Sequence, residues 1–134
     1  MSVHISRGTL GAVLSCLLLL STNGYGAMQA TQGVSVCTSA TTNAEMLNCQ
    51  NLRYQRALAR LKSAYEKLLS KLDAPGKIKL QAAEAAWVVF RKANADFEAD
   101  AARGGTMAPL IRTTVLADMT EARSANLEKS TRLQ

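Results

Sequence analysis

The side chains that could take part in catalysis are few, and their types exclude most enzyme mechanisms. A serine or cysteine nucleophile needs a neighbouring base, but the only histidine, His4, precedes an apolar run at the N-terminus. Asp96, Glu98 and Asp100 could form the paired carboxylates of a glycosidase. Their alternate spacing, close to several arginine and lysine residues, is more typical of a solvated helix face with local ion pairs. We therefore expect that this protein is not an enzyme.

The first 27 residues have the layout of a secretory signal peptide. Polar and basic residues precede an apolar run from Gly11 to Leu20, and small or polar residues follow it. The run is shorter than the roughly 20 residues that span a membrane. We predict that residues 1–27 direct export to the periplasm or the medium and that residues 28–134 form one domain; an uncleaved anchor is the alternative. Lipidation of Cys16 is disfavoured because the apolar run continues past it.

Loss of the signal segment would leave two of the three cysteines, Cys37 and Cys49. An even number in an oxidising compartment predicts one disulfide. Closing a loop of about 13 residues stabilises a fold by roughly 3 kcal/mol in the chain-entropy account. Two free thiols are the alternative. A zinc site would need further ligands, and the mature segment has no histidine, so no metal or cofactor is expected.

The segment from Leu80 to Gly105 holds the only tryptophan and both phenylalanines. Its apolar residues recur at helical spacing and predict a helix with one buried stripe, made of Leu80, Ala83, Trp87, Phe90 and Phe97. Gly104 and Gly105 should end this helix, because glycine tolerates the left-handed backbone that is common just past a helix end. We expect the other helices to pack on this one.

Two further helices are expected on either side. One covers Asn51 to Leu72, ends at the turn Asp73–Gly76, and has a heptad seam of Tyr54, Leu58, Leu61, Tyr65, Leu68 and Leu72. Before it, Thr42 and Glu45 match a capping box and predict a short helix that passes Cys49. The other is expected to begin with Thr106 as its cap and Pro109 in its first turn. Its apolar face is expected at Ile111, Val115, Met119 and Ala122, with Leu116 and Leu127 beside it. The sequence thus predicts an all-α fold: an up-down-up bundle of three main helices, with a short N-terminal helix pinned by one disulfide.

The formal charge of +6 is concentrated on the first main helix, where five residues form a basic stripe: Arg53, Arg56, Arg60, Lys67 and Lys71. Such a stripe attracts nucleic acid, anionic lipid or an acidic polymer. Export and the lack of interleaved aromatic residues argue against nucleic acid. The stripe could be a solvated face. It could also bind an anionic envelope component, a membrane surface or an acidic toxin through Arg53, Arg56 and Arg60.

Short motifs run in order along nearly the whole mature chain. They are Asn43–Cys49 (NAEMLNC), Leu61 with Tyr65, Leu80-x-x-Ala83-x-x-x-Trp87-x-x-Phe90-Arg91, Gly104-Gly105-Thr106, and Thr120-x-x-Arg123-x-x-x-Leu127. Together they resemble the lysozyme inhibitor LprI-like proteins, which are small exported helical domains of bacteria. The resemblance implies structural roles for Tyr65, Trp87, Phe90, Arg91, Gly104, Gly105 and Arg123. We expect the Trp87 ring in the core, covered by the stem of Arg91, with the head of Arg91 in water or on a carboxylate; Arg123 should behave in the same way.

The chain departs from the family pattern at two pairs of positions. Members often carry a second cysteine pair where this chain has Ala95 and Val115, which implies that packing between the second and third main helices replaces that bond. The family's usual Asp and Asn before the tyrosine correspond to Leu58 and Lys62.

The resemblance implies an exported protein that binds lysozyme in the cell envelope and blocks its attack on peptidoglycan. Common animal lysozymes are strongly basic and would repel a basic protein at long range. An acidic patch at Glu84 or Asp96–Asp100 would therefore have to face the enzyme. The candidate residues for this partner are Asp96, Asp100 and Thr106, in or beside the turn at Gly104–Thr106.

Overall fold

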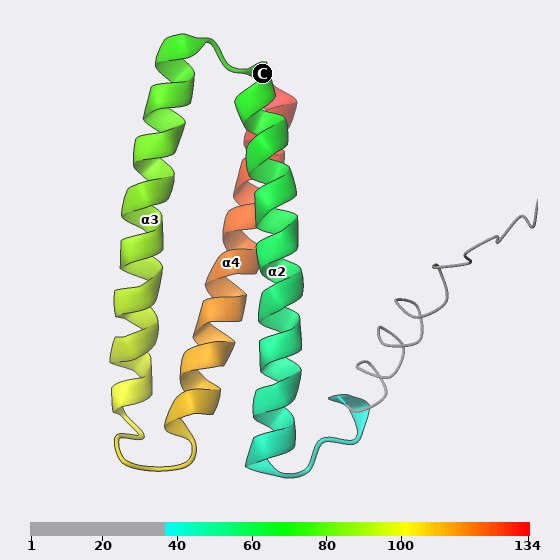
Figure 1. Cartoon of the computed structure of the whole chain (residues 1–134), viewed down its shortest axis with the longest axis vertical. Helices are drawn as coiled ribbons and strands as arrows, with labels where there is room; N and C mark the ends of the chain where they lie inside the picture. Colours follow the sequence, from blue (N-terminus) through cyan, green and yellow to red (C-terminus); the bar gives the residue numbers. More distant parts are fainter. Residues whose placement is uncertain (1–36) are drawn as a thin grey trace, which may run out of the picture.

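The computed structural model describes residues 37–134, which form three long helices and no strand (Figure 1). The helices are α2 (Asn43–Lys71), α3 (Ala74–Asp100) and α4 (Ala108–Leu133). The predicted all-α, up-down-up arrangement is confirmed. The predicted signal segment, residues 1–27, and Cys16 within it lie outside the described residues. Among the helices of the described part, none is long and apolar enough to span a membrane.

Helix α2 begins at the predicted capping box. The Thr42 hydroxyl accepts a hydrogen bond from the Glu45 N–H, and the Glu45 carboxylate accepts one from the Thr42 N–H. The helix then continues through Cys49 and Asn51 without a break. The short N-terminal helix expected before Asn51 is therefore the first part of α2, because no glycine or proline separates the two.

Helix α3 begins at Ala74, earlier than the predicted Leu80. Asp73 caps it by accepting a hydrogen bond from the Gly76 N–H at 2.8 Å. Pro75 lies in the first turn, where the N–H that proline lacks would have no helical partner. The proline and glycine that were expected to end α2 thus also start α3. Helix α3 ends at Asp100 with Ala101 as its C-cap, so it stops before the two glycines that were expected to end it. Gly104 adopts the left-handed conformation (φ 77°) in the turn that follows.

Thr106 is not the helix cap that the sequence suggested. Helix α4 begins at Ala108 after Met107, which makes no side-chain capping hydrogen bond. Pro109 lies in the first turn, as predicted. The Thr106 hydroxyl instead accepts a hydrogen bond from Asn43 Nδ2 at 3.1 Å. This bond ties the α3–α4 turn to the start of α2.

Helix α4, and not α3, is the element on which the others pack. It packs against both α2 and α3, whereas α2 and α3 have few direct contacts with each other (Figure 1). The predicted apolar face of α4 is right only in part, because Leu116 and Leu127, which were expected beside it, are buried, whereas its four central residues are not. Ile111, Val115 and Met119 are half-buried and Ala122 is exposed, while the buried face consists of Leu110, Thr113, Leu116, Ala117, Thr120, Ser124, Leu127 and Thr131.

Several hydroxyl groups lie on the buried face of α4 and are satisfied within the helix. Thr120 donates to the Leu116 carbonyl at 2.6 Å, and Ser124 donates to the Thr120 carbonyl at 2.9 Å. A threonine or serine bonded to the carbonyl one turn earlier leaves no unpaired hydroxyl proton. A face that looks polar in the sequence can therefore lie at the centre of the bundle.

The stripe predicted for α3 is wrong at Ala83, which is exposed, and at both phenylalanines. Leu80 is buried and Trp87 is half-buried, but Phe90 is 59% exposed and Phe97 is 74% exposed. On α2 the predicted seam is confirmed: Leu61 and Leu68 are buried, and Tyr54, Leu58, Tyr65 and Leu72 are half-buried.

Small residues face the contact between α3 and α4. Ala95 is fully buried, and small side chains let two helices approach closely. Two residues near Ala95 bond to α4: Arg91 donates to Thr120, and Asp96 accepts from Arg112. Thr120 and Arg112 lie on either side of Val115 in the sequence of α4. The two helices thus pack together at the level of Ala95 and Val115, as expected where the family carries its second cysteine pair.

Candidate functional site

One end of the bundle brings together the start of α2, the end of α3, the turn that follows it and the start of α4 (Figure 1). We call this region the turn end. Asn43 and Thr106, 63 positions apart in the sequence, share a hydrogen bond there. Beside them lies an open groove of about 580 Å³, lined by Thr42, Asn43, Ala44, Leu47, Thr106 and Pro109. Two stretches that carry the family resemblance are therefore neighbours in space.

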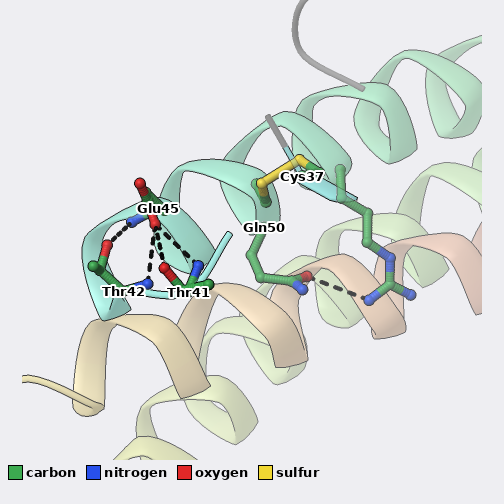
Figure 2. The surroundings of a disulfide bond; sticks show 7 residues. Cys37, Thr41, Thr42, Glu45 and Gln50 are labelled. Atoms are coloured by element: carbon green, nitrogen blue, oxygen red, sulfur yellow. Dashed lines mark hydrogen bonds between the residues drawn. A yellow bond between two sulfur atoms is a disulfide. The ribbon is translucent and has the colours of Figure 1, made fainter. Parts of the chain in front are cut away.

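The disulfide predicted between Cys37 and Cys49 is present at the turn end, with Cα atoms 5.3 Å apart (Figure 2). It holds the segment before α2 against the first turns of that helix. The Glu45 carboxylate accepts hydrogen bonds from the backbone N–H groups of Thr41 and Thr42, each at 3.0 Å. These bonds hold the pKa of Glu45 below its ordinary value. The α2 wall of the groove is thus anchored covalently and by hydrogen bonds.

The acidic candidates Asp96 and Asp100 lie at the turn end, but each already has a basic neighbour. Asp96 bonds to Arg112 of α4 at 2.5 Å, and Asp100 bonds to Arg103, with both carboxylates about half exposed. The hydrogen bond to Asp100 raises the pKa of Arg103. In all, the turn end carries four carboxylates and two guanidiniums: Glu45, Asp96, Glu98, Asp100, Arg103 and Arg112. It is therefore an acidic region in a chain of formal charge +6.

The third acidic candidate, Glu84, lies away from the turn end and is mostly buried in an ion pair. Its carboxylate bonds to Arg123 at 2.5 Å, and the two side chains are 15% and 21% exposed. The prediction that the Arg123 head lies on a carboxylate is confirmed. This ion pair links the middle of α3 to α4.

Trp87 and Arg91 form a cluster in the middle of the bundle. The Arg91 side chain is buried, and its Nη1 donates to Thr120 Oγ1 at 2.9 Å. The rings of Trp87 and Tyr54 lie beside its guanidinium. The prediction that the Arg91 head lies in water or on a carboxylate is therefore wrong, because neutral groups from three helices surround it. No spacing signal in the sequence could reveal Thr120 as the acceptor.

The basic stripe of α2 is largely paired with groups on α4. The pairs are Arg53 with Asp118 and Glu121, Arg60 with Glu128, and Lys71 with the Thr131 carbonyl. The hydrogen bond to Glu121 raises the pKa of Arg53. Arg56 and Lys67 are exposed. The stripe thus holds α2 to α4 and offers fewer free charges to a partner than the sequence suggested.

A second open groove, of about 310 Å³, is lined by Leu58, Leu61, Lys62, Tyr65 and Glu84. It lies between α2 and α3, which contact each other little. Two of its lining residues, Leu58 and Lys62, are positions at which the chain departs from the family pattern. Helical spacing did not reveal this groove, because periodicity alone does not say which helices touch.

The fold and the turn end define a class of protein: a small, disulfide-anchored three-helix domain with an open groove at one end and no metal cluster of three or more His, Cys, Asp or Glu residues within positions 37–134. Residues 36–127 match the family described as Lysozyme inhibitor LprI, and the chain belongs to this family. The matched region includes the disulfide, α2, α3 and most of α4. No curated protein and no solved structure shows significant similarity to the chain.

Proposed function

We propose that this protein is exported to the cell envelope, binds a lysozyme-like peptidoglycan hydrolase directly and inhibits it, with the turn end as the binding surface. Membership of an inhibitor family supports inhibition as the activity. The choice of surface rests on the meeting of Asn43–Cys49 with Gly104–Thr106 through the Asn43–Thr106 hydrogen bond. This bond is exposed, so its residues contribute little to the core and are accessible to a partner.

The turn end is also preorganised for binding. The Cys37–Cys49 disulfide and the capping box at Thr42 and Glu45 hold the groove wall in one conformation before any partner arrives. Binding to a rigid surface loses less conformational entropy than binding to a flexible one. A small domain can therefore bind tightly through a modest contact area.

Charge favours the same surface. A basic lysozyme is repelled at long range by a chain of formal charge +6. The turn end has more carboxylates than guanidiniums, so that repulsion is weaker there than the overall charge implies. Lowering the salt concentration distinguishes two cases. If the overall charge dominates, association with a basic lysozyme through the turn end should become slower, and if the local carboxylates dominate, it should become faster.

A lytic assay tests the proposal. The oxidised protein is titrated against c-type, g-type and i-type lysozymes at two salt concentrations, and inhibition of one class near equimolar ratio is expected. Ala44→Arg, which adds a large side chain at an exposed position of the groove, should weaken inhibition at least about tenfold, or 1.4 kcal/mol. The matched control is Ala125→Arg, at an exposed position in the far half of α4. Equal inhibition by the two variants would contradict the choice of surface, and no inhibition of any class would contradict the activity.

A second test addresses the acidic residues. Asp96→Lys together with Asp100→Lys should abolish inhibition of a basic lysozyme. The thermal midpoint should change little, because half-exposed ion pairs contribute only about 0–1 kcal/mol each. Inhibition that is retained by this double variant would show that the carboxylates do not face the enzyme.

The alternative function, binding of an anionic polymer or membrane surface, rests on Arg56 and Lys67, two exposed members of the basic stripe. Arg56→Glu with Arg60→Glu should release the protein from the envelope fraction if this function operates. It has less support, because Arg53 and Arg60 have carboxylate partners on α4.

A further inference from the structure

The outer face of α3 is apolar and has no partner within residues 37–134. Ile78 is 66% exposed, Val89 71%, Phe90 59% and Phe97 74%. The opposite face of α3 is the buried one, with Leu80, Ala95 and Ala99. Burying apolar surface stabilises a protein by about 25 cal/mol per Å², and a contiguous exposed apolar patch marks an interaction surface.

The exposed residues of this face follow a heptad seam. Six exposed positions alternate in steps of three and four residues: Lys79, Ala82, Ala86, Val89, Ala93 and Asp96. This is the spacing by which two helices pack side by side. The alanines allow a close approach, while the larger Phe90 and Phe97 flank the seam and can cover it.

We propose that a second copy of this chain occupies this face, with the two α3 helices packed antiparallel about a twofold axis. Placing Lys79 opposite Asp96 of the second copy brings Ala82 opposite Ala93 and Ala86 opposite Val89. The seam is thus complementary to itself, as a twofold interface requires. No shift of register is needed to match both the charges and the small residues.

Charge selects the antiparallel orientation. The seam has a cation at its N-terminal end, Lys79, and an anion at its C-terminal end, Asp96. An antiparallel pair forms the Lys79–Asp96 contact twice, whereas a parallel pair would place Lys79 against Lys79 and Asp96 against Asp96. Asp96 is half exposed beside Arg112 and can therefore accept a second cation. The antiparallel dimer would carry its two turn ends at opposite extremes, so the groove beside Asn43 and Thr106 would remain open in both copies, whereas Asp96 would lie within the dimer contact.

Sedimentation velocity over a concentration series of the purified, oxidised protein tests the dimer. The wild type is expected to reach twice the mass of the single purified chain. Ala86→Glu places two carboxylates close to the twofold axis and should weaken self-association by at least about tenfold. Ala59→Glu, at an exposed position of α2, is the matched control and should associate like the wild type. Circular dichroism should show the same helix content for both variants, because both positions are exposed in the single chain.

A charge exchange tests the orientation. Lys79→Glu should weaken the dimer, and adding Asp96→Lys should restore it, because the antiparallel pair regains opposite charges at both sites. In a parallel dimer, Lys79→Glu alone would replace one like-charge contact by another and change little. A single-chain mass at every concentration would overturn the proposal. So would self-association that Ala86→Glu leaves unchanged, which would point to another surface such as the apolar segment Gly11–Leu20.

Discussion

The Arg91 guanidinium carbon lies over the Trp87 ring, 4.7 Å from the ring centre. The Tyr54 ring centre is 5.5 Å away, and Nη1 of Arg91 donates to the Thr120 hydroxyl. One side chain of α3 therefore contacts its own helix, α2 and α4. The buried cation is stabilised by the negative faces of two rings and by a hydroxyl, and its Nε has no hydrogen-bond partner in the described part of the chain. Since α2 and α3 otherwise contact each other little, this cluster is a main link among the three helices.

Arg91→Lys should lower the free energy of unfolding by about 1–2 kcal/mol. A compact ammonium cannot stack its plane on Trp87 or keep the fork geometry that reaches Thr120. Urea unfolding followed by circular dichroism measures the change, and the fluorescence of Trp87 reports the loss of the contact. Arg132→Lys, at an exposed position near the end of α4, is the control and should leave the midpoint unchanged. Equal midpoints for the two variants would mean that the rings and Thr120 do not hold the Arg91 cation.

Thr120→Val should destabilise the fold by about 1–3 kcal/mol, because it keeps the side-chain shape but leaves a buried guanidinium N–H without its acceptor. Thr114→Val is the control: the partly buried Thr114 hydroxyl donates to the Leu110 carbonyl at 2.9 Å, and its loss should cost less. The penalty of Thr120→Val should shrink when Arg91 is replaced by Met, since no donor then remains unpaired. An undiminished penalty in that double variant would refute the coupling.

Glu84→Gln should cost about 1–3 kcal/mol, because the bond from Arg123 is charge-assisted and largely shielded from water. Asp100→Asn is the comparison: it breaks an exposed pair with Arg103 in the turn that follows α3, and exposed pairs contribute little because water screens them. Adding salt should weaken the exposed pair more than the shielded one. Thermal unfolding of both variants at low and high salt would show which pair stabilises the fold more and which pair is more sensitive to salt. A larger contribution from the exposed pair would contradict the burial argument.

Stability should fall in acid partly through Glu45. Hydrogen bonds from the backbone of Thr41 and Thr42 lower its pKa in the folded state below the ordinary value of 4.5. A lowered carboxyl pKa contributes stability above the unfolded value, and this contribution is lost as the pH falls through the folded value. Urea midpoints measured from neutral pH to well below 4.5 should therefore decline more steeply for the wild type than for Glu45→Gln, which can still accept a capping hydrogen bond but does not titrate. Parallel curves would exclude Glu45 as a source of the acid sensitivity.

Local features of the chain were predictable from the sequence because they depend on neighbouring residues. The capping box at Thr42 and Glu45, the left-handed Gly104, the place of Pro109 in a first turn and the Cys37–Cys49 disulfide were all expected and are present. The seam of α2 was also expected, because leucine and tyrosine side chains at heptad spacing usually pack against other helices. Each signal concerns backbone conformation or one helix face, which the local sequence decides.

Which faces meet could not be predicted in the same way. The phenylalanines of α3 suggested the core, but Phe90 and Phe97 point to water, and α3 packs on α4 through small residues such as Ala95. On α4 the predicted apolar face left out Thr120 and Ser124, which are fully buried. A hydropathy pattern treats a hydroxyl that is bonded within its own helix as polar, and it treats alanine as only weakly apolar. It therefore did not identify the buried faces of α3 and α4.

The sequence by itself determined three helices, their order, the disulfide and the family, because helix caps, turns, cysteine number and residue spacing act over short distances along the chain. Only the tertiary structure decided that α4 is central, that Asn43 meets Thr106, that Arg91 lies among Trp87, Tyr54 and Thr120, and that Arg53 and Arg60 of the basic stripe are paired with acids of α4. These relationships depend on how closely whole helices can approach, which is set by side-chain shape and by the pairing of buried polar groups between segments far apart in the chain.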